Sequence, residues 1–194
     1  MLELAGKLSQ LERQDWTDEV TRSTLSTDEV DSLLMTVREA SAISTDSAIR
    51  RKFLAFITHG GLKYPASSDE VRKLSRSSTA VLQNLEGTNE IFGMLGDGIK
   101  SEFHPKVSFS AYLSSTESHK LGMHVDKWDN IVIQLSGSKV FILESGKTDQ
   151  LLPGEVLLLP QDLKHDVTTS SYSIHLSIVL LRESWMRSEG WSLY

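Results

Sequence analysis

The sequence of 194 residues contains no cysteine, so disulfide bridges, thiolate metal sites and cysteine nucleophiles are excluded. No apolar run approaches the roughly 20 residues that a membrane-spanning helix requires. The first residues mix charges with leucines and lack the apolar segment of a secretory signal. We therefore expect a cytoplasmic protein with no membrane-embedded part.

The chain also lacks an excess of positive charge. Its net charge of −6 argues against a nucleic-acid-binding surface, although it leaves room for a local basic patch. Internal repeats, low-complexity tracts and clear linkers are missing as well. The length, with 39% hydrophobic and 24% charged residues, is typical of one soluble globular domain with its own core. We therefore expect a single domain over 1–194 and no nucleic-acid partner.

The first part of this domain, 1–104, carries mainly helical patterns. Two serine–glutamate pairs have the spacing of capping boxes, which mark helix starts. Apolar residues recur every four positions over 90–103, although three glycines weaken that helix. A short apolar run at 52–58 predicts a strand. The capping pairs are Ser26–Glu29 and Ser67–Glu70.

After Pro105, short strand-like runs replace the helical patterns, and glycine- and proline-containing turns separate them. Many short strands with regular turns predict a two-sheet antiparallel barrel over 105–182. The barrel type that builds a metal site in its mouth is the double-stranded β-helix, or cupin jelly roll. Runs 130–136 and 139–144, joined by Gly137-Ser138, predict a hairpin. A tail at 183–194 follows the barrel.

His124-Val125-Asp126 is the centre of the predicted site. Residues at i and i+2 of a strand share a face, so His124 and Asp126 would both point inward. An imidazole and a carboxylate supply two ligands of a two-histidine, one-carboxylate triad, which leaves positions on an octahedral iron open. The triplet alone is weak, because such triplets also occur in surface loops.

A second histidine is needed to complete this triad. His165 follows a strand and a turn that would bring it back across the barrel from His124. The other histidines in or near the barrel remain alternatives at this stage. They are His104, His119 and His175.

The combined spacing resembles the Jumonji-C oxygenases of the cupin superfamily, which use Fe(II) and 2-oxoglutarate. The pattern is most similar to the ribosomal-oxygenase-like hydroxylases and covers about residues 107–180. The matching segments are SAYL at 110–113, GMHVD at 122–126, QLSGSK at 134–139, LLPGEVLLLP at 151–160 followed by His165, and HLS at 175–177.

The resemblance implies that His124, Asp126 and His165 bind iron and that Lys139 binds the distal carboxylate of 2-oxoglutarate. It also implies a role in that cosubstrate pocket for Tyr112 and Ser110. Ser110 stands where the family has an asparagine, and a serine reaches less far. The residues interpreted as lining the pocket or contacting substrate are Trp128, Asn130, His175 and Ser177.

The residues around Lys139 also indicate its position, independently of the resemblance. On a strand it shares a face with Phe141 and Leu143, and a lysine on an apolar face needs a partner. The alternative is a hairpin lysine whose amine reaches out to water. Tyr112 and His175 likewise have an alternative as ordinary core residues with an incidental hydrogen bond.

The implied activity is hydroxylation of a carbon in an amino acid, a peptide or a small biosynthetic intermediate. Fe(II), 2-oxoglutarate and dioxygen would be consumed or bound, and succinate and CO2 released. The aromatic tail at 183–194 is interpreted as packing over the barrel or pairing two protomers in a homodimer. Two alternatives stay open: a non-catalytic cupin that binds a metal or ligand, and a cupin metalloenzyme that does not use 2-oxoglutarate.

Overall fold

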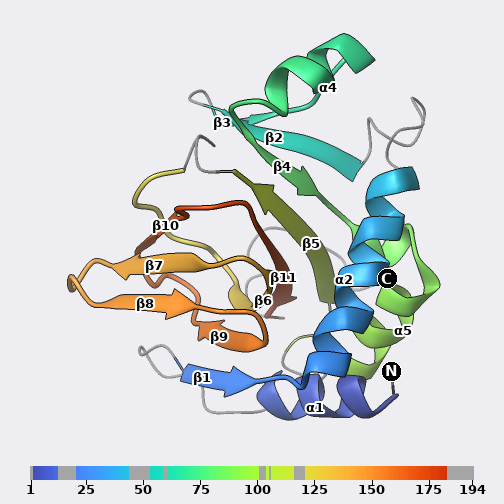
Figure 1. Ribbon diagram of the computed structural model, residues 1–194. Helices are drawn as coiled ribbons and strands as arrows, with labels where there is room; N and C mark the ends of the chain where they lie inside the picture. The colour runs from blue at the N-terminus through green and yellow to red at the C-terminus, as the bar shows by residue number, and fades with distance from the viewer. Residues whose placement is uncertain are drawn as a thin grey trace.

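The computed structural model describes residues 2–12, 21–43, 53–58, 61–100, 104, 106–115 and 121–182. Two antiparallel sheets face one another (Figure 1). The larger has eight strands in the order β1-β9-β6-β11-β5-β4-β2-β3, and the smaller has three in the order β10-β7-β8. The predicted two-sheet β-barrel is therefore confirmed.

Most strands of the barrel lie where the sequence predicts them. The strands are β1 Thr21–Thr24, β2 Leu54–Thr58, β3 Gly61–Lys63, β4 Thr79–Leu82, β5 Lys106–Ser114, β6 Asp129–Ser136, β7 Lys139–Leu143, β8 Thr148–Leu151, β9 Glu155–Leu159, β10 His165–Thr168 and β11 Ser173–Leu181. The helical segments are α1 Leu2–Glu12, α2 Thr27–Ile43, α4 Ser68–Leu74, the 3₁₀ turn η1 Leu85–Gly87 and α5 Glu90–Ile99.

The Ser26–Glu29 capping box is formed in full, and Ser67 caps α4 although Glu70 returns its bond to the Ala66 N–H. The Glu29 carboxylate accepts from the Ser26 backbone N–H at 2.7 Å, and the Ser26 hydroxyl accepts from the Glu29 N–H at 3.4 Å. At α4 the Ser67 hydroxyl accepts from the Glu70 N–H. These bonds satisfy N–H groups that a helix start leaves without partners, so local chemistry fixes where α2 and α4 begin.

Helices α1, α2 and α5 lie on one side of the large sheet, and the small sheet lies on the other (Figure 1). The glycines of α5 explain how it packs so closely. A Cβ on Gly98 would be 3.0 Å from the Ala5 side chain of α1, and one on Gly96 would be 3.3 Å from Phe109. Glycine has a low helix propensity, but here the glycines allow α5 to pack closely against neighbours on two sides.

Alternation along β5 and β11 divides the large sheet into an apolar face and a polar face. The apolar face belongs to the core shared with the helices and includes Phe109, Ala111, Ile174, Leu176 and Ile178. Residues of opposite parity face the small sheet and include Tyr112, Ser114, His175 and Ser177. A period of two therefore places every functional candidate on these strands on the inner face.

Two features differ from the sequence-based expectation. Strands β1, β3 and β4, which the sequence did not predict, come from the mainly helical region 1–104 and extend the large sheet. The predicted hairpin is wrong: β6 pairs with β9 and β11, whereas β7 pairs with β8 and β10. The link between β6 and β7 is a corner between the sheets. Gly137 makes it possible, because its φ is 65° and an added Cβ would be 2.1 Å from the Tyr172 carbonyl oxygen.

Candidate metal centre

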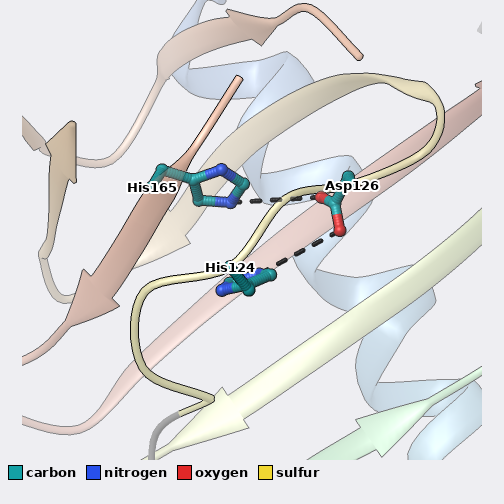
Figure 2. Close-up of side chains that lie close together, drawn as sticks. All are labelled: His124, Asp126 and His165. Atoms are coloured by element: carbon teal, nitrogen blue, oxygen red, sulfur yellow. Dashed lines mark ion pairs between the residues drawn. The ribbon is translucent and has the colours of Figure 1, made fainter. Parts of the chain in front are cut away.

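His124, Asp126 and His165 converge between the two sheets (Figure 2). Each offers one ligand atom, and these atoms all lie within 4.8 Å of one another. The Nε2 atoms of His124 and His165 are each 4.0 Å from a different oxygen of Asp126. His165 starts β10, while His124 and Asp126 lie on the loop before β6 and not on a regular strand as predicted from the sequence. Only an isolated bridge to His165 gives His124 a strand-like pairing.

The backbone holds the two histidines opposite each other. His124 N–H donates to the His165 carbonyl and His165 N–H to the His124 carbonyl, each at 2.9 Å. This antiparallel bridge holds together two histidines that are 41 residues apart in the sequence (165 minus 124). The sequence prediction that His165 returns opposite His124 matches this placement.

Backbone carbonyls also orient both imidazole rings. Nδ1 of His124 is 2.7 Å from the Gly122 oxygen, and Nδ1 of His165 is 2.9 Å from the Leu163 oxygen. A carbonyl can only accept, so each Nδ1 carries the proton and each Nε2 presents a lone pair. This second contact to a backbone carbonyl is typical of histidines that ligate metals.

Burial lowers the pKa of His165, with the His124 charge acting in the same direction, although its bond to Leu163 and the charges of Asp126 and Asp166 raise it. The net shift favours the neutral imidazole, the form that binds a metal. Two neutral imidazoles and one carboxylate suit a divalent ion such as iron, cobalt or manganese. The donor chemistry therefore fits the ion that the sequence predicts.

A cavity between the sheets extends from this cluster to Lys139. The large sheet supplies one wall and β7 with β10 supply the other. Most of its remaining lining is apolar or hydroxylic, and includes Ile57, Val132, Phe141, Leu159, Val167 and Thr168. A concave, mostly apolar site with a few convergent polar groups is the usual form of a small-molecule site.

Lys139 is buried on this inner face with only 4% of its surface exposed. Its Nζ donates to the Ser114 hydroxyl at 3.0 Å, and no carboxylate pairs with it among the residues that the structure describes. Burial lowers the pKa of Lys139 to about 7. The alternative of an amine reaching out to water is therefore wrong, and the cavity holds a buried amine with which no carboxylate of the described residues pairs.

Tyr112 and His175 stack beside this lysine. Their ring planes are within 6° of parallel, with centroids 4.6 Å apart, and the Lys139 amine lies 5.9 Å from the Tyr112 centroid. Burial lowers the pKa of His175 well below its usual value, and the Lys139 charge adds to that shift. Nδ1 of His175 is buried without a hydrogen-bond partner in the described part of the chain. The His175 ring thus brings a nitrogen that is unpaired among the described residues to the lysine end of the cavity.

The other predicted pocket residues divide into two groups. Asn130 and Ser177 line the cavity and bond to each other, the Ser177 hydroxyl donating to Asn130 Oδ1 at 2.8 Å. Ser110 and Trp128 are not part of the cavity lining. Ser110 lies one step along β5 from the lining residues, opposite Ser177. A direct role for Ser110 and Trp128 in the pocket therefore stays a prediction.

Sequence reasoning missed two hydroxyl groups next to Lys139. Ser114 accepts from the lysine and also accepts from Thr79 at 3.0 Å, and both residues line the cavity. Ser114 has the same strand parity as Tyr112, which was the available signal. Thr79 belongs to β4, a strand that the sequence did not predict.

Solved structures with a similar fold include two of one bacterial enzyme. The ribosomal oxygenase YcfD of Escherichia coli superposes on 92% of this chain with a TM-score of 0.59 and 16% sequence identity. The match covers 54% of the YcfD chain. A second YcfD structure, in complex with cobalt and succinic acid, gives a TM-score of 0.52 over 70% of this chain and 41% of its own, also at 16% identity. The fold is that of a Jumonji-C-like cupin.

The chain spans only about half of the YcfD chain that it matches over 92% of its own length. A cupin-2 domain protein from Shewanella frigidimarina also matches, but with a TM-score of 0.35 it adds no argument. No protein-family model and no curated protein sequence matches the chain. None of the described helices is long and apolar enough to cross a membrane.

Proposed function

We propose that this protein is an Fe(II)- and 2-oxoglutarate-dependent oxygenase that hydroxylates a carbon of an amino acid, a peptide or a small biosynthetic intermediate. One observation carries the proposal: Lys139 is buried, without a carboxylate partner in the described chain, in the same cavity as His124, Asp126 and His165. A buried ammonium without a counter-charge is costly to the protein. An anionic ligand that also reaches the metal would remove that cost.

His124, Asp126 and His165 would hold the iron, and their donor set leaves positions for cosubstrate and oxygen. Bound Fe(II) supplies the oxidation, in which dioxygen and 2-oxoglutarate give succinate, CO2 and one oxygen atom inserted into a substrate C–H bond. The chain's own part is to hold the imidazoles in their Nδ1–H form, orient the ligands and limit access of water through the apolar walls.

Lys139 would bind the distal carboxylate of 2-oxoglutarate, with Ser114 holding the amine in place. Tyr112 can donate its hydroxyl to the same carboxylate, because burial and the Asp126 charge raise its pKa to about 12 and keep it protonated. His175 offers a neutral ring nitrogen beside them. One YcfD structure contains cobalt and succinic acid, a metal and a dicarboxylic acid, which supports this choice of ligand.

The test is product analysis with the purified protein, Fe(II), 2-oxoglutarate, air and pools of amino acids and short peptides. The proposal expects succinate to form together with a product heavier by one oxygen atom, and expects neither from His165→Ala. Formaldehyde with loss of a methyl group would contradict hydroxylation. Absence of succinate from every pool, with the metal bound, would favour the non-catalytic cupin.

A further inference from the structure

A second buried cluster surrounds Asp129, the first residue of β6 and the third residue after Asp126. Its side chain has no exposed surface. The carboxylate accepts from His104 Nε2 at 2.9 Å, from the Gln161 backbone N–H at 2.9 Å and from Nε and Nη2 of Arg182. Burial alone would raise the pKa of Asp129, but these bonds hold it below its usual value. The group is therefore a buried, charged and fully engaged acceptor.

The same turn that bonds Asp129 also bonds the loop carrying the metal ligands. The Asp162 N–H donates to the Asp126 carbonyl at 2.7 Å, and the Lys127 amine pairs with the Asp162 carboxylate at 2.6 Å. The segment 126–129 is thus fastened at both ends to residues 161–162. We call these two segments and their bonds the ligand clamp.

The ligand clamp joins the two chain segments that carry Asp126 and His165. Asp126 is inside one segment, and His165 follows the other by three residues (165 minus 162). Asp162 sits at φ 61°, a left-handed conformation that aspartate tolerates better than most residues but that still costs energy. Contacts elsewhere must hold such a turn in place, and the bond from Gln161 to Asp129 is one of them.

We propose that Asp129 is a positioning residue for the metal centre, acting through Gln161 and Asp162 on the spacing between Asp126 and His165. The inference rests on the proposed function only in assuming that the cluster binds a divalent metal. Partners that orient metal ligands typically contribute about 10- to 100-fold to metal affinity. A change at Asp129 should therefore weaken metal binding beyond any general loss of stability.

Asp149 supplies the matched control. It is also a buried aspartate bonded to an arginine, with Oδ1 3.2 Å from Arg22 Nε. It belongs to β8, outside the cavity lining and the ligand clamp. Loss of its charge removes an aspartate–arginine ion pair that is part-buried, and among the described residues no side-chain bond connects it to a metal ligand.

The experiment titrates Co(II) into the full chain by visible absorption and measures urea unfolding of the same proteins. Asp129→Asn should weaken Co(II) binding on the order of 10-fold or more, whereas Asp149→Asn should leave it within about twofold. Unchanged affinity in Asp129→Asn, or an equal loss in both variants, would overturn the positioning role. Failure of the wild-type protein to bind Co(II) would instead refute the proposed metal site itself.

A second variant keeps the test decisive if Asp129→Asn does not fold. Arg182→Lys leaves the carboxylate and its bond from Gln161 but removes the forked contact. The proposal expects a smaller loss of Co(II) affinity, of about severalfold. Full affinity in a folded Arg182→Lys protein with reduced stability would show that the network is structural only.

Discussion

At the scale of single residues, Lys139 decides between a dicarboxylate-using enzyme and a plain metal-binding cupin. Its amine has the Ser114 hydroxyl as a partner but no counter-charge in the described chain. Strand parity predicted that Lys139 would face the apolar interior, because alternate residues of β7 are buried. Its contact with Ser114 could not be predicted, since it depends on how the two sheets pack.

Replacing Lys139 tests this directly. Removing one member of a buried ion pair typically costs about 3–5 kcal/mol, and each 1.4 kcal/mol is about tenfold in affinity. We expect Lys139→Met to weaken 2-oxoglutarate binding by roughly two to three orders of magnitude while Mn(II) affinity is retained. Calorimetry on the Mn-loaded protein measures both. Lys147→Met, at an exposed lysine in the β7–β8 turn, is the control and should bind normally.

The lowered pKa of Lys139 also predicts how binding depends on pH. A carboxylate binds the ammonium form, which the free protein loses as the pH rises through about 7. The affinity for 2-oxoglutarate should therefore be full below that pH and fall above it, by up to about tenfold per pH unit. Affinity that stays flat up to the ordinary lysine pKa of 10.5 would contradict the lowered pKa of this amine.

At the scale of elements, local sequence signals predicted where helices and strands begin, and which of the two forms, better than they predicted which strands pair. The Ser26 and Ser67 caps, β2 and the barrel strands follow from spacing within a few residues. Strand β1, with the sequence TRST, has no apolar alternation and exists through its pairing with β9 more than 130 residues later. The Gly137-Ser138 turn looks like a hairpin turn locally, and only distant pairing makes it a corner between sheets.

This corner gives a prediction about stability. Gly137→Ala would place a Cβ 2.1 Å from the Tyr172 carbonyl oxygen at φ 65°, so we expect a loss of more than about 2 kcal/mol in the free energy of unfolding. Gly146→Ala is the matched control, since its φ is 82° but no atom lies within 4 Å. It should cost about 1 kcal/mol from backbone strain alone. Equal losses in urea unfolding would show that close packing at the corner is unimportant.

At the scale of the whole molecule, the metal ligands come from β10 of the small sheet and from the loop that precedes β6 of the large sheet, so metal binding should stabilise the folded barrel. A ligand at about 100 times its Kd adds about 2.7 kcal/mol to the free energy of unfolding. We expect Mn(II) to give this gain in the wild-type protein and in His175→Ala, but not in His165→Ala. Urea unfolding with and without Mn(II) measures it. A gain kept without His165 and lost without His175 would mean that the ligand assignment is wrong.

The most direct test of the central claim is an anaerobic titration of the Fe(II)-loaded protein with 2-oxoglutarate, followed by visible absorption. It needs no knowledge of the substrate. A cosubstrate that chelates iron held by His124, Asp126 and His165 should produce a weak visible charge-transfer band that saturates with 2-oxoglutarate. The band should be absent in Asp126→Ala and require far more 2-oxoglutarate in Lys139→Met. An iron-loaded protein that shows no band at any concentration would contradict the account.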